Sequence, residues 1–106
     1  MQTLPLEQVV LTNHALRRLN GRRIPFDAVR TVMTYGRAVW VLGARVFVVG
    51  QREVRRWRDR GIDLRPFEGI HIVATAEGTV LTAYRNRNLR RLRRNSHRRR
   101  RRRPWS

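Results

Sequence analysis

The chain contains no cysteine and no lysine. The missing cysteine excludes disulfides, thiol catalysis and cysteine-ligated metal sites. No apolar run approaches the roughly 20 residues of a membrane-spanning helix, and the first residues lack the basic-then-apolar pattern of a secretory signal. We therefore expect a cytoplasmic protein that does not associate with a membrane.

Positive charge is abundant and unevenly placed. All 25 basic residues are arginines, and the net charge is +18. Residues 1–84 hold 13 arginines and all 7 acids, a net charge of +6, whereas residues 85–106 hold 12 arginines and no acid. Such a field attracts polyanions, of which nucleic acid is the commonest in a cell. The alternatives are a solvated tail in a chain biased toward arginine codons and, less strongly, contact with an anionic membrane surface.

The first third of the chain has the pattern of two amphipathic helices. Thr12 or Asn13 can cap the first helix, and Gly21 can end it by adopting the left-handed conformation. The second helix is expected from Pro25 to Tyr35, because proline suits a first helical turn and apolar residues recur there at helical spacing. It should end at the glycine that follows.

The pattern then changes to that of extended structure. Residues 38–42 and 45–49 are rich in Val, Phe and Trp and predict a hairpin around Gly43-Ala44. Residues 70–75 and 79–85 alternate in the manner of strands and predict a second hairpin, whose three-residue turn contains a glycine. Which face of each strand is buried depends on a register that the sequence does not fix.

Together these patterns predict an α+β domain over residues 1–88, with two N-terminal helices packed on a small, mainly antiparallel sheet of two hairpins. Residues 51–60 indicate a third helix or an irregular excursion, and residues 62–68 a loop. Residues 89–106 form an arginine-rich tail. Its last part, residues 95–106, should be disordered without a polyanion, because like charges at that density oppose compaction.

The predicted first helix carries a basic cluster. His14, Arg17 and Arg18 recur at spacings of three and four, so an imidazole and guanidinium groups can share one surface. Such an arrangement resembles one side of a phosphate-binding site. It is equally typical of an ordinary amphipathic helix in a very basic protein.

Three short motifs resemble a small bacterial family of uncharacterised domains that is related in pattern to the RelE and BrnT toxins. They are His14-Ala15-Leu16-Arg17-Arg18, Arg23-Ile24-Pro25 and Thr82-Ala83-Tyr84-Arg85. The family's hallmark is His-Ala-x-x-Arg followed by Arg-Gly-Ile, and this chain has Gly-Arg-Arg-Ile in the second place. The resemblance covers about residues 12–87. It implies a compact RelE-type α+β fold, RNA as substrate or ligand, and an antitoxin as a partner.

Metal-independent RNA cleavage needs an acid–base group and cationic donors for the charge that develops on the phosphate. The catalytic candidates are therefore His14 as acid or base, Arg18 on the phosphate, Arg85 or Arg45 stabilising charge, and Tyr84 donating a proton or stacking on a base. The alternative for His14 is a structural role in the first helical turn, through capping or packing.

Further arginines are candidates for binding the nucleic-acid backbone. They are Arg17, Arg22, Arg23, Arg45, Arg87, Arg90, Arg91, Arg98, Arg99, Arg100, Arg101, Arg102 and Arg103. The three histidines are far apart and lack a paired acid pattern, so we expect neither a metal site nor a cofactor. His71 is expected to be a strand residue on the face opposite Ile70 and Ile72.

Two hypotheses follow. The chain is a nucleic-acid-binding protein, with RNA as the first choice, that is also a metal-independent ribonuclease of the toxin type. Alternatively it is a non-catalytic, arginine-rich binder of rRNA, DNA or a nucleoprotein assembly, which uses the tail through counterion release.

Overall fold

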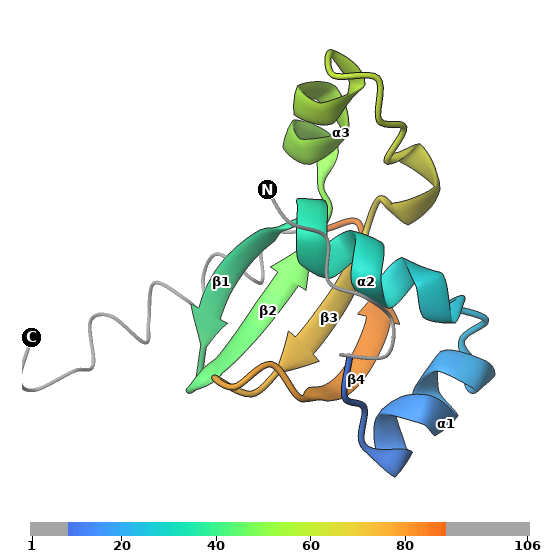
Figure 1. Cartoon of the computed structure of the whole chain (residues 1–106), viewed down its shortest axis with the longest axis vertical. Helices are drawn as coiled ribbons and strands as arrows, with labels where there is room; N and C mark the ends of the chain where they lie inside the picture. Colours follow the sequence, from blue (N-terminus) through green and yellow to red (C-terminus); the bar gives the residue numbers. More distant parts are fainter. Residues whose placement is uncertain (1–8, 89–106) are drawn as a thin grey trace, which may run out of the picture.

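The computed structural model describes residues 9–88 (Figure 1). In chain order these residues form α1 (Asn13–Gly21), α2 (Phe26–Tyr35), β1 (Arg37–Val41), β2 (Ala44–Val48), α3 (Gln51–Arg58), the 3-10 turn η2 (Arg65–Phe67), β3 (Ile70–Ala74) and β4 (Val80–Arg85). The strands form one antiparallel sheet in the order β1-β2-β3-β4. The predicted α+β class is confirmed, with a third helix at α3. The expectations for residues 89–106 lie outside the described residues.

The helices α1 and α2 cover one face of the sheet (Figure 1). The strand register places Phe47 beside Ile72 and Ile72 beside Ala83, so these three side chains share the covered face. They form the main core with apolar residues of the helices, which are Ala15, Leu19, Ala28, Val29 and Val32. The opposite face carries a second, smaller cluster around Val46 and Val48. The register thus settles which strand residues are buried against the helices.

The chain that leads into α1 pairs with the outer edge of β4 at its first residue, Val80. The Val80 N–H donates to the Val10 carbonyl at 2.8 Å, and the Thr12 N–H donates to the Val80 carbonyl at 3.0 Å. Leu11 forms a single parallel bridge with Val80, so the lead-in is not a full strand. This pairing satisfies the outward-facing N–H and carbonyl of Val80. It also fixes the start of α1 against β4.

The end of α1 differs from the prediction. Gly21 is the last helical residue and does not adopt the left-handed conformation, which Arg23 takes instead, with φ of 54°. The Arg23 N–H donates to the Asn20 carbonyl at 3.4 Å and the Ile24 N–H to the Leu19 carbonyl at 3.0 Å. This is the Schellman arrangement, in which the apolar residue after the left-handed position packs back on the helix. Burial of Ile24 therefore decides where the turn occurs.

We expect Arg23→Gly to raise the free energy of unfolding by about 1 kcal/mol, because a side chain with Cβ is strained at positive φ. The chain contains its own control at the end of α3, where Gly61 occupies the equivalent position with φ of 80°. Gly61→Arg should lower the free energy of unfolding by a similar amount. Urea denaturation measures both, and an unchanged midpoint for Arg23→Gly would contradict the strain argument.

The first hairpin turns one residue earlier than predicted. Its turn is Leu42-Gly43 rather than Gly43-Ala44, and both turn residues have positive φ, 50° and 82°. Two positive φ values are what a two-residue turn requires to match the twist of the strands. The shift pairs Trp40 with Arg45, and both lie on the face of Phe47.

Candidate functional site

His14 lies exposed in the first turn of α1. It does not cap the helix, because the Thr12 hydroxyl accepts the Ala15 N–H at 3.1 Å. Instead His14 Nε2 accepts a hydrogen bond from Arg18 Nε at 3.3 Å. With Nε2 as the acceptor, the neutral ring carries its proton on Nδ1. The expected surface shared by the imidazole and a guanidinium is therefore present.

The basic residues of α1 line a shallow hollow of about 510 Å³, formed by His14, Arg17, Arg18, Gly21 and Arg22. We call it the α1 hollow. Arg22 also lines an adjacent hollow of about 580 Å³ together with Tyr84 and Arg85 of β4. The candidate residues of α1 and those of β4 are more than 60 residues apart in the chain. The side chain of Arg22 lines both hollows and so connects the two groups.

Arg22 connects the candidate residues of α1 to those of β4 by a hydrogen bond. One guanidinium nitrogen of Arg22, Nη1, donates to the Ala83 carbonyl of β4 at 2.7 Å. That carbonyl belongs to the residue directly before Tyr84. The bond fixes the end of α1 relative to β4, as Thr12 and Val80 fix its start. Arg22 is therefore a positioning residue as well as a source of charge.

His71 supports Tyr84 from within the sheet. The two rings stack with centroids 4.6 Å apart and an angle of 14° between their planes. His71 is buried, on the face opposite Ile70 and Ile72 as predicted, and its Nδ1 lies 2.9 Å from the Gly69 carbonyl. Burial, with a smaller contribution from the Arg37 charge, lowers the pKa of His71, although the bond to Gly69 opposes this. A neutral, buried ring suits a support for Tyr84 better than an acid–base group.

Some sequence candidates lie elsewhere. The Arg45 guanidinium lies over the rings of Phe47 and Trp40, 5.1 Å and 5.6 Å from their centroids, and does not line either of these hollows. Of the two arginines proposed to stabilise charge, Arg85 is the one that the fold places beside Tyr84. Arg23 is exposed in the turn after α1. Candidates from Arg90 to Arg103 lie outside the described residues.

Sequence reasoning missed a second basic hollow, of about 740 Å³, where α3 begins. Arg37, Arg52, Arg55 and Arg87 line it, and only Arg87 was a candidate from the sequence. The run of arginines in residues 52–58 could have drawn attention to α3. Nothing in the sequence alone places Arg37 and Arg87 next to that helix.

Residues 9–88 offer neither a metal site nor a membrane span. No cluster of three or more His, Asp or Glu side chains there is arranged to hold a metal ion. Within the same range, every helix is too short or too polar to cross a membrane. No family model, curated protein or solved structure matches the chain. Its function must therefore be inferred from its residues and their geometry.

Proposed function

We propose that the chain is an RNA-binding protein whose primary contact surface is the α1 hollow with the adjoining Tyr84 and Arg85. The observation that carries the proposal is the junction made by Arg22, which lines both hollows. Along this junction guanidinium groups surround an exposed imidazole and an aromatic ring. Guanidinium groups bind phosphate oxygens in pairs, and an aromatic ring can stack on a base.

The balance of charge supports the same proposal. Residues 9–88 contain fifteen arginines and six acidic residues. Over that range the ion pairs are Arg37 with Glu53 and Arg65 with Asp63, both away from the α1 hollow. The positive charge of Arg17, Arg18 and Arg85 is therefore left for an anion from outside. The tail adds further positive charge, which strengthens attraction to any polyanion.

RNA is preferred to DNA because of the motifs. The residues that resemble the RelE- and BrnT-related family, His14 to Arg18 and Thr82 to Arg85, come from α1 and β4. These two elements pack together, so the motif residues belong to one region of the surface. We extend the proposal to a RelE/BrnT-like fold and to an antitoxin or nucleoprotein partner. Fold resemblance alone does not transfer an activity, so RNA binding must be measured.

The test compares two double variants with equal loss of charge. Arg17→Ala/Arg18→Ala removes two guanidiniums from the α1 hollow, whereas Arg58→Ala/Arg60→Ala removes two exposed ones from the end of α3 and the turn after it. We expect the first variant to bind a labelled, uncleavable 2′-O-methyl oligouridylate about tenfold more weakly than wild type, and the control within about twofold. Fluorescence anisotropy at several salt concentrations measures this. Equal loss in both variants, or affinity that does not fall with salt, would refute the proposal.

A second candidate function is metal-independent cleavage of the bound RNA. The observation in its favour is the bond between Arg18 Nε and His14 Nε2, which presents an exposed imidazole in a basic hollow. Such a ring can donate its Nδ1 proton, and it can accept a proton at Nε2 when Arg18 releases that nitrogen to bind phosphate, while nearby guanidiniums stabilise the charged transition state. Incubating wild-type protein with unmodified RNA in excess EDTA tests it. Intact RNA in that experiment leaves the non-catalytic binder as the function.

A further inference from the structure

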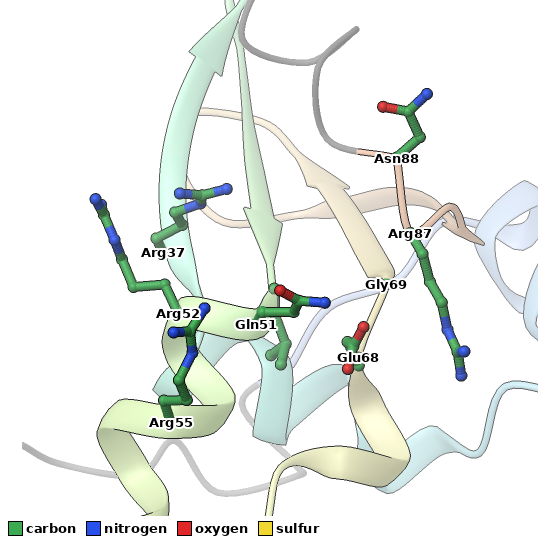
Figure 2. A pocket seen from close by; sticks show the side chains of 10 residues that line it. Arg37, Gln51, Arg52, Arg55, Glu68, Gly69, Arg87 and Asn88 are labelled. Carbon is green, nitrogen blue, oxygen red and sulfur yellow. The ribbon is translucent and has the colours of Figure 1, made fainter.

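A hollow of about 740 Å³ lies at the end of the sheet where α3 begins. Figure 2 shows Arg37, Arg52 and Arg55 along one side and Arg87 on the other, with Gln51 and Glu68 between them. These residues come from the start of β1, from α3 and from the segments before β3 and after β4. We call this hollow the α3 cleft. None of its arginines lines the α1 hollow.

Three of the four arginines in the α3 cleft form no ion pair with a carboxylate of the described residues. In residues 9–88 no carboxylate forms an ion pair with Arg52, Arg55 or Arg87, and all three are exposed. Arg37 is partly buried, and its Nε lies 3.9 Å from Glu53 Oε1. Like charges around a hollow repel one another unless an anion enters. The cleft is therefore suited to a ligand that carries concentrated negative charge.

The side chains, rather than the helix end, must hold that ligand. Glu53 folds back on the start of α3, where its Oε1 accepts the Gly50 N–H at 2.8 Å. The buried Glu53 carboxylate therefore already occupies the N-terminal end of the helix. Guanidinium groups remain as the donors, and their planar geometry suits the oxygens of a phosphate. Glu68 is a carboxylate on the same cleft and would oppose the phosphate.

The α3 cleft is connected to the α1 hollow through shared residues. Tyr84 and Arg85 line the hollow next to α1 and also a third one, beside His71. Asn88 lines that third hollow and the α3 cleft as well. A chain of adjoining depressions thus follows β4 and the residues after it, from one basic site to the other. The middle hollow is lined mainly by apolar side chains, and Arg85 is the one arginine that lines it. A single strand fits such a path, because arginines can bind phosphates at its two ends and Tyr84 offers an aromatic ring between them.

We propose that the α3 cleft binds a backbone phosphate of the same single RNA strand that contacts the α1 hollow. This inference rests on the proposed RNA-binding function. The strand passes Tyr84 and Arg85 between the two sites. Arg52 and Arg55 grip the phosphate, Arg87 reaches it from the other side, and Glu68 weakens the binding.

The experiment uses the full-length protein and a labelled 12-nucleotide 2′-O-methyl oligouridylate. Arg52→Ala/Arg55→Ala should weaken binding by about tenfold and reduce the slope of log affinity against log salt by about 0.7 for each phosphate that the variant no longer neutralises. The matched control on the chain from α3 into the next turn, Arg58→Ala/Arg60→Ala, should change affinity by no more than about twofold. Glu68→Gln should tighten binding by roughly two- to threefold, because it removes a charge that repels the phosphate. Circular dichroism confirms that each variant is folded.

The outcomes separate this inference from the function on which it rests. If wild type binds and the Arg17→Ala/Arg18→Ala variant is weakened, but Arg52→Ala/Arg55→Ala equals its control, the α3 cleft is not a phosphate site and RNA binding by the α1 hollow stands. If wild type does not bind the oligonucleotide, both proposals fail. Weakening by Arg52→Ala/Arg55→Ala beyond that of Arg58→Ala/Arg60→Ala, which loses the same charge, supports the cleft. Tightening by Glu68→Gln supports it where it exceeds that of Glu77→Gln, which makes the same change of net charge in the turn before β4.

Discussion

His14→Ala is expected to lower the rate of the proposed metal-independent RNA cleavage by about 10²- to 10⁴-fold, the usual contribution of a positioned acid–base group. The reason is geometric. The exposed imidazole lines the α1 hollow, and its Nε2 lies 3.3 Å from Arg18 Nε, so an acid–base group lies beside a guanidinium that can bind phosphate. Gel analysis of a labelled RNA in excess EDTA, under single-turnover conditions, measures the rate.

The control for His14→Ala separates chemistry from binding and folding. His14 is exposed and its side chain bonds to Arg18, itself an exposed residue, so stability should change by less than about 0.5 kcal/mol. Affinity for the uncleavable 2′-O-methyl RNA should stay within about threefold of wild type, because Arg17, Arg18 and Arg22 remain. Full cleavage by His14→Ala would exclude His14 as the acid–base group. Loss of RNA binding in parallel with cleavage would mean that His14 binds rather than catalyses.

Local patterns in the sequence were enough to predict α1, α2 and both hairpins, whereas α3 was left open between a helix and an irregular excursion, and η2 was expected to be part of a loop. Helical spacing located α1 and α2, and alternation with β-favouring residues located both hairpins. The residues that form the turns were harder to predict. Placing the first turn at Gly43-Ala44 and the left-handed residue at Gly21 assumed that glycine takes every positive φ, whereas Leu42 and Arg23 also adopt it. At Arg23 the burial of Ile24 outweighs local conformational preference, whereas either position of the first turn puts the same residues of β1 and β2 on each face.

The candidate site was predictable only in part. The spacing of His14 and Arg18 within one helix is a local property, and the bond between them follows from it. Long-range packing alone brings Tyr84 and Arg85 to α1 through Arg22. The α3 cleft is more distant still from any pattern, because Arg37 and Arg87 reach it from segments 50 residues apart whose positions depend on the strand order. Residues that share a surface without sharing an element are invisible to periodicity.

Gly36→Ala is expected to lower the free energy of unfolding by about 3 kcal/mol, through overpacking. Gly36 ends α2 and leads into β1, with an ordinary φ of −74°, so its backbone needs no special freedom. A Cβ there would lie 2.5 Å from the Val32 carbonyl oxygen and 2.8 Å from that of Val48. Both obstacles are backbone atoms of fully buried residues, which cannot move unless the end of α2 separates from β2. Urea denaturation of the full-length protein measures the loss.

Gly21→Ala is the matched control for Gly36→Ala. Gly21 is helical, and a Cβ there meets no atom within 4 Å, so this substitution should raise the free energy of unfolding by about 0.5–1 kcal/mol. The same chemical change then has opposite effects on stability at the end of α1 and at the end of α2. Because the packing of α2 on β2 also sets where β1 begins, Gly36→Ala should displace Arg37, which lines the α3 cleft. A Gly36→Ala variant as stable as wild type would show that α2 and β2 are not in close contact at this point.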